Sequence, residues 1–335
     1  MRLYTQALCQ TLPAVSSELT DRILAAPRTP QAHRALMAQL EALHKIEVKW
    51  EGSVSAPLPH EVTIAAWNLE RCLDPIASAH TLAAHAPDIV LLSEMDCGMA
   101  RTHQAHTTQI LAQSMGMGYA YGVEFHELGL GSGPELERVV DDHNQSGWHG
   151  NAILSKTPPK QIFQIRLDDH GHWFCGAQGV DDAQPRIGGR VAIAAIFPTT
   201  QGYVCAVSTH LESAGNIGIR QSQVDRIIAA VDDFAPGLPV VIGGDLNTGN
   251  NLASNDWRDE TLFAAAERQG FSFENNAGGV TTRPSRLTRF PDRAMKLDWF
   301  FHRDCKGLDC EIVAALDTSG VPLSDHEMIL GRFSL

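Results

Sequence analysis

The sequence predicts an α/β protein built in layers, and three observations support this prediction. Short apolar, β-branched runs recur from residue 61 onward, and each run ends in polar residues. Helical stretches lie between several of these runs, as expected when helices cover the faces of a sheet. Apolar residues make up 44% of the 335-residue chain and charged residues 19%, so the chain can bury a large core.

Residues 1–58 differ from the rest of the chain and predict a helical extension that ends in a linker. A short helix is expected over residues 17–26. After Pro30, a residue favoured at a helix start, three leucines recur at helical spacing and predict a second helix. The prolines of the run SVSAPLPHE then indicate the linker.

Eight apolar runs after residue 60 predict the strands: VTIAAWNLE, DIVLLSEMD, GNAILSK, VAIAAIF, YVCAVSTHLES, PVVIGGDLNT, KLDWFF and HEMILGRF. Because these runs are apolar almost throughout, we expect strands that are covered on both faces. The helices expected between them cover residues 74–85, 107–115, 220–234 and 261–269.

Charge and cysteine content limit the partners and the location of the protein. The chain carries 39 acidic and 26 basic residues, a net charge of −13. Nucleic-acid binding depends on Lys and Arg at phosphates, so this balance favours smaller substrates without excluding a nuclease. We expect no transmembrane segment and no secretory signal, because the apolar runs are too short. The seven cysteines include no CxxC pair and indicate reduced thiols, so we expect a cytoplasmic protein.

Polar side chains follow or open nearly all of the predicted strands. A turn or a cap explains any one of them, but a set dominated by Asp, Glu, Asn and His indicates a shared site. Carboxylate and amide oxygens are the ligands that Mg²⁺ prefers, and a histidine paired with an acid suits phosphoester hydrolysis. The set comprises Asn68, Glu70, Glu94, Asn151, His210, Asp245, Asn247, Asp298, Asp325 and His326.

The motifs that hold these residues resemble, in chain order, those of the endonuclease/exonuclease/phosphatase superfamily. They are WNLE, LLSEMD, GNAILSK, STHLES, GGDLNT, KLDWFF and LSDHEMI, and they extend over about residues 61–335. The resemblance implies a four-layer α/β/β/α sandwich of two packed mixed sheets, preceded by the N-terminal helical extension. It divides the chain into an extension and linker over residues 1–58 and a catalytic domain over residues 59–335.

The resemblance also implies a site for a divalent metal ion. Glu94 resembles the principal metal ligand of the family, with Asn68 beside it, and Asp325 resembles the acid that helps to frame the metal. Glu70 stands where many nuclease members carry Asp, and it is a further candidate ligand. Because oxygen ligands select hard ions, the expected cofactor is Mg²⁺ or Mn²⁺.

Five residues resemble the catalytic residues of the family. His326 resembles the base that activates the attacking water, and Asp298 the acid that orients it. His210 resembles the second histidine of the phosphodiesterase and phosphatase branches. Asp245 and Asn247 resemble the pair that positions the nucleophile and holds the transition-state oxygens; the alternative that Asp245 is the base stays open.

Four further residues are candidate contacts to the substrate. Asn151 lies in a run that resembles the Gly-Asn-x-x-Leu-Ser strand of the family. Arg190 opens an apolar run and either faces the site or caps the strand. Arg286 and Arg289 belong to residues 280–296, a basic segment of an acidic chain that either grips substrate phosphates or is a solvated loop.

Some other polar residues have both a structural and a functional interpretation. Residues 101–106, together with Glu124, His126 and His149, either form an outer shell of the site or are hydrogen-bonded packing residues. Trp67, Trp148 and Trp173 either stack on a substrate or pack in the core or at the rim. For all of these residues the packing role is favoured.

The leading functional hypothesis is a metal-dependent phosphodiester hydrolase that uses a His-activated water. Its substrate would be a small, lipid-like or short nucleotide phosphoester. The alternative is an endo- or exonuclease that acts on DNA or RNA, which the net charge does not favour. A third hypothesis is an inactive, hydrolase-like interaction protein, but the motif set is intact and opposes it. The sequence identifies no protein partner.

Overall fold

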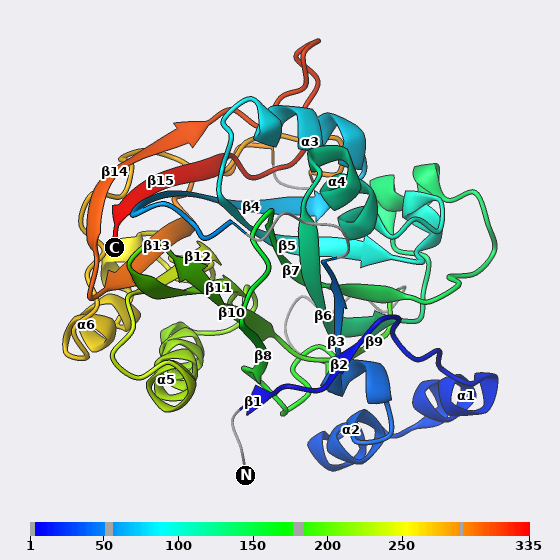
Figure 1. Cartoon of the computed structure of the whole chain (residues 1–335). Coiled ribbons are helices and arrows are strands. Elements are labelled where there is room, and N and C mark those ends of the chain that lie inside the picture. Colours follow the sequence, from blue (N-terminus) through cyan, green and yellow to red (C-terminus); the bar gives the residue numbers. More distant parts are fainter. Residues whose placement is uncertain (1–3, 51–55, 177–183, 289–290) are drawn as a thin grey trace.

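Two mixed β-sheets pack face to face at the centre of the molecule, as the computed structural model shows (Figure 1). The structure describes residues 4–50, 56–176, 184–288 and 291–335. The smaller sheet contains, in spatial order, β1 (Tyr4–Thr5), β8 (Gln161–Arg166), β10 (Val191–Thr199), β11 (Gly202–His210), β12 (Val240–Asp245) and β13 (Asp298–Arg303).

The larger sheet holds nine of the described strands, and one of them, β9 (Arg186–Gly188), pairs with β6 outside the main path. The main path runs in the order β14 (Lys306–Val313), β15 (Met328–Ser334), β4 (Glu61–Arg71), β5 (Ile89–Cys97), β7 (Trp148–Ser155), β6 (Gly118–Glu127), β3 (Ile46–Lys49) and β2 (Leu8–Cys9).

Helices cover the outer face of each sheet. The α-helices are α1 (Ser17–Ala25), α2 (Pro30–Met37), α3 (Pro75–Ala83), α4 (Thr107–Met115), α5 (Ile217–Phe234) and α6 (Leu262–Glu267). Short 3₁₀ turns are η1 (Glu41–His44), η2 (Ala100–Thr102), η3 (Gly133–Arg138) and η4 (Trp257–Asp259). Within the described ranges, no helix is both long and apolar enough to cross a membrane.

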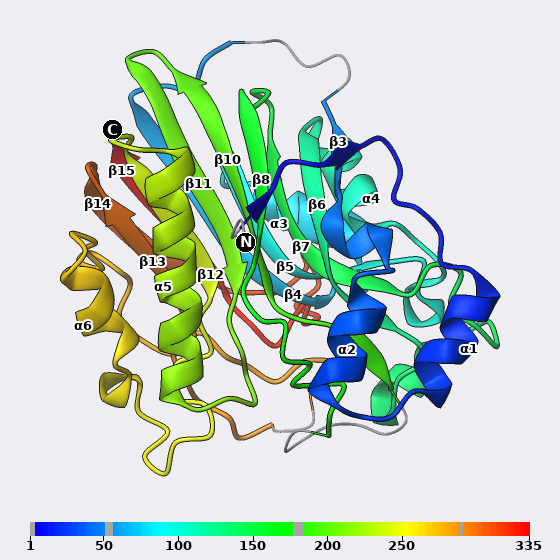
Figure 2. The same ribbon diagram turned by 90° about the horizontal axis from the view of Figure 1, so that it is seen from below.

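Three apolar clusters correspond to the three interfaces between layers. The middle cluster joins residues of both sheets, such as Ile64 of β4 and Ile193 of β10. A second cluster packs α3 and α4 on the larger sheet, and a third packs α5 and α6 on the smaller one (Figures 1 and 2). The expected four-layer α/β/β/α sandwich is therefore confirmed.

Helix α5 shows why these residues form a covering helix. The side chain of Asn216 caps its first turn by accepting a hydrogen bond from the backbone N–H of Ile219. Val224, Ile227 and Ile228 recur at helical spacing and are buried against the smaller sheet (Figure 2). Burial of this apolar face, more than helix propensity, stabilises α5.

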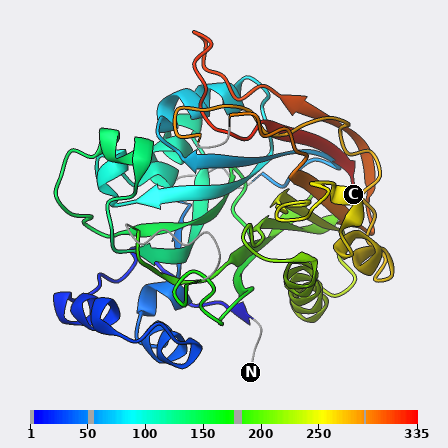
Figure 3. The same cartoon turned by 180° about the vertical axis from the view of Figure 1, so that it is seen from behind.

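The N-terminal segment contains the two expected helices and also strands that the sequence analysis did not anticipate. Strand β1 pairs with β8 of the smaller sheet, whereas β3 pairs with β6 of the larger sheet. The segment is therefore hydrogen-bonded to both sheets, and α1 and α2 lie at the opposite end of the molecule from α6 (Figure 3). The domain boundary at residue 58 stays a prediction.

Strand register brings the predicted site residues to one end of the sandwich. His210 ends β11 and is paired with Asp245 of the parallel strand β12, which is paired in turn with Asp298 of β13. In the larger sheet, Asn68 of β4 is paired with Ser93 of β5, so Glu94 follows at the same edge. Chain direction and pairing alone therefore gather polar residues from widely separated motifs.

Candidate active site

Asp245 lies at the centre of the site and contacts residues from both sheets. Its Oδ2 accepts a hydrogen bond from Asn68 Nδ2 at 3.0 Å. The same oxygen lies 3.5 Å from His210 Nε2 and 3.6 Å from His326 Nε2. The structure thus brings three of the expected residues around one buried carboxylate oxygen of a fourth, Asp245.

His326 and Asp298 form the expected imidazole–carboxylate pair. His326 Nδ1 lies 2.8 Å from Asp298 Oδ2, and Nε2 faces the site. Burial opposes a charge on the ring, but the carboxylates of Asp298, Asp245 and Asp325 raise the pKa of His326 well above its ordinary value. The backbone of His326 is also held, because its carbonyl accepts a hydrogen bond from the buried Trp67 indole at 2.8 Å.

Two of the metal-site candidates, Glu70 and Glu94, lie on strained backbone within β4 and β5. Glu70, Arg71 and Glu94 all have positive φ angles, of 45°, 77° and 57°, and Asn247 has one of 50°. Such conformations are unfavourable for residues other than glycine and often mark functional sites. A break in strand register follows Asn68, and another accompanies Glu94. These irregularities change the direction of the side chains at the strand ends.

Glu94 is a partly buried carboxylate that contacts a guanidinium group. Arg71 Nη1 pairs with Glu94 Oε2, and Asn68 Nδ2 donates to Glu94 Oε1 at 3.2 Å. Burial alone would raise the pKa of Glu94, but the charge of Arg71 holds that pKa well below its ordinary value. Arg71 is itself held by Glu135 Oε1, which accepts from its Nε at 2.9 Å.

Glu70 and Asp325 add negative charge beside Glu94. Burial, and then the nearby Asp325, raise the pKa of Glu70 to about 8, although Ser285 Oγ donates to this carboxylate at 2.8 Å. Burial also raises the pKa of Asp325 despite the neighbouring His326. The pKa values of Glu70 and Asp325 are thus raised, whereas that of Glu94 is lowered by Arg71. Together the three carboxylates form an oxygen-rich donor set that fits a hard divalent cation.

These groups border a cleft of about 260 Å³. Its lining combines acidic, basic and aromatic side chains. The lining residues are Glu70, Arg71, Glu94, Phe125, Glu135, His149, Trp173, Arg186, Arg190, Ser213, Leu287, Thr288, Arg293 and Asp325.

Asn247 is held by a chain of hydrogen bonds that reaches the cleft. Its backbone N–H donates to Asp245 Oδ1 at 2.8 Å, and its Nδ2 donates to the carbonyl of Leu211 at 3.0 Å. Its Oδ1 accepts from Asn250, whose own Oδ1 accepts from Arg293 Nη2 at 2.9 Å. The basic segment predicted from the sequence is therefore connected to the site through Arg293.

Arg190 faces the site, as one of the two sequence interpretations expected. Its Nη1 lies 2.7 Å from His210 Nδ1 and donates to Glu124 Oε2 at 3.2 Å. Asn151 donates to the other oxygen of Glu124 at 3.2 Å and is fully buried. Asn151 thus orients the carboxylate that holds Arg190, and it is not one of the residues that line the cleft described above.

The model of the Endonuclease/Exonuclease/phosphatase family matches residues 65–326, well over half of the chain. The chain belongs to the endonuclease/exonuclease/phosphatase family. The matched span contains every predicted catalytic and metal-site residue, from Asn68 to His326.

Solved structures similar to this family member support the fold. An endonuclease/exonuclease/phosphatase from Beutenbergia cavernae has a TM-score of 0.57 and 17% identity, over 82% of this chain and 72% of that one. The human Nocturnin catalytic domain with bound sulfate anion has a TM-score of 0.53 and 19% identity, over 83% and 96%. A humanized D. rerio TDP2 has a TM-score of 0.52 and 16% identity, over 82% of this chain and 100% of that one. Comparison with curated protein sequences gave no match.

Sequence reasoning missed three residues around the cleft of this family member: Arg71, Glu135 and Arg186. Arg71 directly follows the WNLE motif, but only the left-handed backbone turns it onto Glu94. Glu135 and Arg186 lie in stretches without a recognisable motif, and no sequence signal distinguishes them. Trp173, for which packing was favoured, lines the cleft.

The basic segment reaches the cleft with some of its described residues. Arg293 lines the cleft together with Leu287 and Thr288, whereas the described side chain of Arg286 is not part of the lining. Arg289 lies outside the described residues. Substrate contacts of Arg286 and Arg289 therefore stay predictions.

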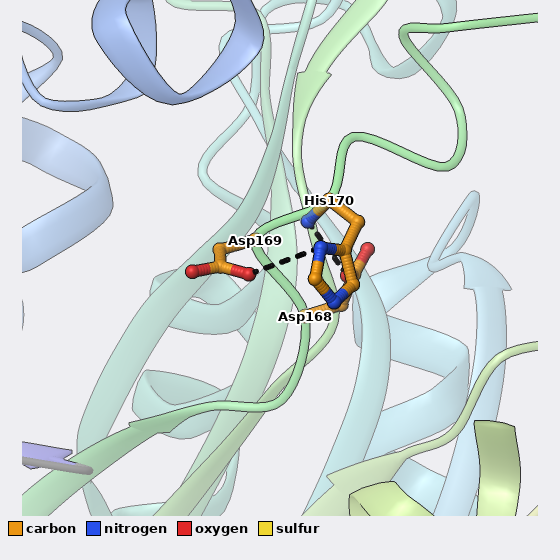
Figure 4. Close-up of side chains that lie close together, drawn as sticks. All are labelled: Asp168, Asp169 and His170. Carbon is orange, nitrogen blue, oxygen red and sulfur yellow. Dashed lines mark hydrogen bonds and ion pairs between the residues drawn. The ribbon is translucent and has the colours of Figure 1, made fainter. Parts of the chain in front are cut away.

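Among the described residues, two groups of three acidic and histidine residues bring potential ligand atoms together. The atoms of Asp245, Asp298 and His326 lie within 4.8 Å of one another inside the active site. The second group, Asp168, Asp169 and His170, follows β8 (Figure 4). There the backbone N–H of His170 donates to Asp168 Oδ1 at 2.8 Å, which is a local turn interaction.

His126 provides a test of the packing interpretation. The ring is 6% exposed and lies 4.7 Å from the Trp148 ring, between centroids. Burial lowers the pKa of His126 to about 4, against about 6.5 in an unfolded chain. Between these values the unfolded chain binds the proton and the folded chain does not, so stability falls as pH falls.

We therefore predict that His126 costs about 3 kcal/mol of stability between pH 7 and pH 4. Urea unfolding at pH 7, 5.5 and 4.5 should show a smaller acid-induced loss for His126→Phe than for the wild type. His143→Phe, at an exposed position, should keep the wild-type dependence. Identical pH dependence of wild type and His126→Phe would contradict the prediction.

Proposed function

We propose that the protein is a divalent-metal-dependent phosphodiester hydrolase that acts on small, lipid-like or short nucleotide substrates. Members of its family are typically metal-dependent phosphoesterases or nucleases. The observation that carries the proposal is the acidic cluster of Glu70, Glu94 and Asp325 in one cleft beside the His326–Asp298 pair. This arrangement supports metal binding and water activation in one place.

The proposed metal ligands are Glu94, Asp325, Glu70 and the amide oxygen of Asn68, and the proposed ion is Mg²⁺ or Mn²⁺. A bound cation would neutralise charge that develops on the phosphoryl oxygens and make a coordinated water more acidic. The raised pKa of Glu70 agrees with this role, because burial and the nearby Asp325 disfavour its charged form, which a bound cation would favour. Arg71 supplies part of the positive charge beside Glu94.

The proposed base is His326, acting through Nε2. Its Nδ1 is engaged by Asp298, which fixes the ring orientation and stabilises the imidazolium after proton transfer. Asn68 and His210 both contact Asp245 Oδ2, and Asn247 contacts Asp245 Oδ1 through its backbone N–H. We propose that these residues position the attacking water and hold the phosphoryl oxygens.

The cleft supports a small substrate over a long polyanion. At about 260 Å³ it suits a compact phosphoester. The four arginines that line it belong to this one cleft of a chain with a net charge of −13. A protein that follows a duplex needs an extended series of phosphate contacts. A cytoplasmic location is also proposed, because all seven cysteines are free.

The proposed metal dependence can be tested by removing and restoring the ion. Chelation should abolish hydrolysis of bis-p-nitrophenyl phosphate, and Mg²⁺ or Mn²⁺ should restore it, because the oxygen donors select hard ions. Glu94→Gln keeps the shape of the side chain but removes its charge, and should lose about 100-fold or more in turnover. Glu41→Gln, at an exposed position, is the matched control and should keep wild-type turnover.

Wild-type turnover in Glu94→Gln would overturn the proposed ligand. The same metal series with supercoiled plasmid and short single strands decides between the two enzyme hypotheses. Cleavage of nucleic acid that exceeds hydrolysis of the small ester by an order of magnitude would favour the nuclease.

The proposed role of His326 as the base can be tested by its replacement. His326→Ala should lower kcat by about 10²- to 10⁴-fold, the usual contribution of a general base, while circular dichroism shows an intact fold. His143→Ala, which removes an exposed histidine, should leave kcat unchanged. A loss below tenfold in His326→Ala would assign the base to another group, with Asp245 as the first alternative.

A further inference from the structure

Besides the four carboxylates Glu70, Glu94, Glu135 and Asp325, several basic side chains line the cleft. Four arginines line it, Arg71, Arg186, Arg190 and Arg293, although the chain has a net charge of −13. Arg190 is engaged by Glu124 and lies beside His210, so it belongs to the proposed reaction centre. Arg186 contacts none of the proposed catalytic or metal-site residues in the described part of the chain. Its position therefore needs a separate explanation.

Arg186 is held firmly in place at the wall of the cleft. Its guanidinium carbon lies 5.1 Å from the ring centre of Trp173 and 5.5 Å from that of Phe125. The Trp173 indole in turn donates to Glu212 at 3.0 Å, which fixes that ring. Because contact with two aromatic rings already restricts this guanidinium group, it loses little conformational freedom when it binds an anion.

The charge of Arg186 is only partly compensated by its surroundings. Its Nη1 lies 3.2 Å from Glu127 Oε1, but the other oxygen of Glu127 lies 2.8 Å from the buried Arg101. Burial lowers the pKa of Arg186, and the nearby charges of Arg71 and Arg101 oppose the effect of Glu127. Arg186, which is only partly buried, thus shares Glu127 with the buried Arg101, and an additional anion in the cleft would be stabilised.

The distance between Arg186 and the reaction centre limits the size of the ligand. The guanidinium carbon of Arg190 lies 5.6 Å from the same Phe125 ring centre. The two guanidinium carbons are therefore at most about 11 Å apart, the sum of their distances to that centre. Two anionic groups separated by one sugar or a short carbon chain can reach both arginines.

We propose that Arg186 binds a second anionic group of the substrate, so that preferred substrates are small phosphodiesters with a further phosphate close to the scissile group. Phe125 and Trp173 provide an apolar surface for the part of the substrate between or beside the two anions. The inference rests on the proposed function, because the reacting phosphoester is placed at the proposed metal site.

A matched pair of esters tests the inference. The 4-nitrophenyl ester of thymidine 5′-phosphate is compared with the same ester that carries a 3′-phosphate, at constant Mn²⁺ and ionic strength. The 3′-phosphate should lower KM by roughly 10- to 100-fold, the range for charge-assisted hydrogen bonds. In Arg186→Gln the ratio of the two KM values should approach one, whereas Arg186→Lys should retain part of it. Arg258→Gln, at an exposed position, should keep the full ratio.

A binding experiment separates failure of the inference from failure of the proposed function. Calorimetry compares thymidine 3′,5′-bisphosphate with thymidine 5′-phosphate on the full chain. A preference for the bisphosphate that is lost in Arg186→Gln supports the second anion site even if neither ester is hydrolysed, and then only the proposed function fails. Equal affinities, or a preference that Arg186→Gln retains, overturn the inference.

A third arm identifies the source of the second phosphate. A single-stranded hexanucleotide is titrated in the same buffer at 50 and 200 mM salt. Binding weaker than that of the bisphosphate supports a small-molecule ligand. Tighter binding that falls steeply with salt overturns the small-molecule class and identifies a nucleic-acid strand as the source of the anion.

Discussion

The contacts of the Asp245 carboxylate join the two sheets at the active site. One oxygen of Asp245 faces Asn68 of the larger sheet and His210 of the smaller sheet, and His326 approaches the same atom. Since Asp245 is 2% exposed, its charge has to be balanced by these neighbours rather than by water. The requirement to pair this buried charge constrains the ends of β4, β11 and β12 to meet.

A second group of buried charges surrounds Arg101 and reaches the cleft at Glu135. Arg101, which is 1% exposed, contacts Asp96, Glu127 and Glu135. Removing one member of such a group leaves an uncompensated buried charge, which is strongly destabilising. The network therefore holds Arg71 and Arg186 in place, because both share their carboxylate partners with Arg101.

The sequence predicted the elements whose residues follow a simple pattern. The apolar runs of β4, β5, β10, β11 and β12 could be recognised because both faces of these strands are buried. Strand β6 could not, because its buried positions include Glu124 and Glu127, whose charges are paired with arginines elsewhere in the chain. Strands β1, β2 and β3 have two to four residues, too few for a periodic signal.

In the candidate active site, too, residues in a simple sequence pattern could be predicted, and residues that depend on tertiary contacts could not. Residues at strand ends could be predicted to converge, because strand direction places them at one edge of the sandwich. Arg71, Glu135 and Arg186 could not, because left-handed backbone and long-range ion pairs determine their positions. Sequence motifs thus identify the reaction centre, whereas the charged wall of the cleft depends on the tertiary structure.

The most direct test of the account is equilibrium binding of Mn²⁺, followed by electron paramagnetic resonance. We predict that the wild-type protein binds Mn²⁺ and that Glu94→Gln and Asp325→Asn weaken this binding at least about tenfold, because each variant removes one anionic oxygen ligand. Wild-type protein that binds no Mn²⁺, or variants that bind it as tightly as the wild type, would contradict the proposed metal centre.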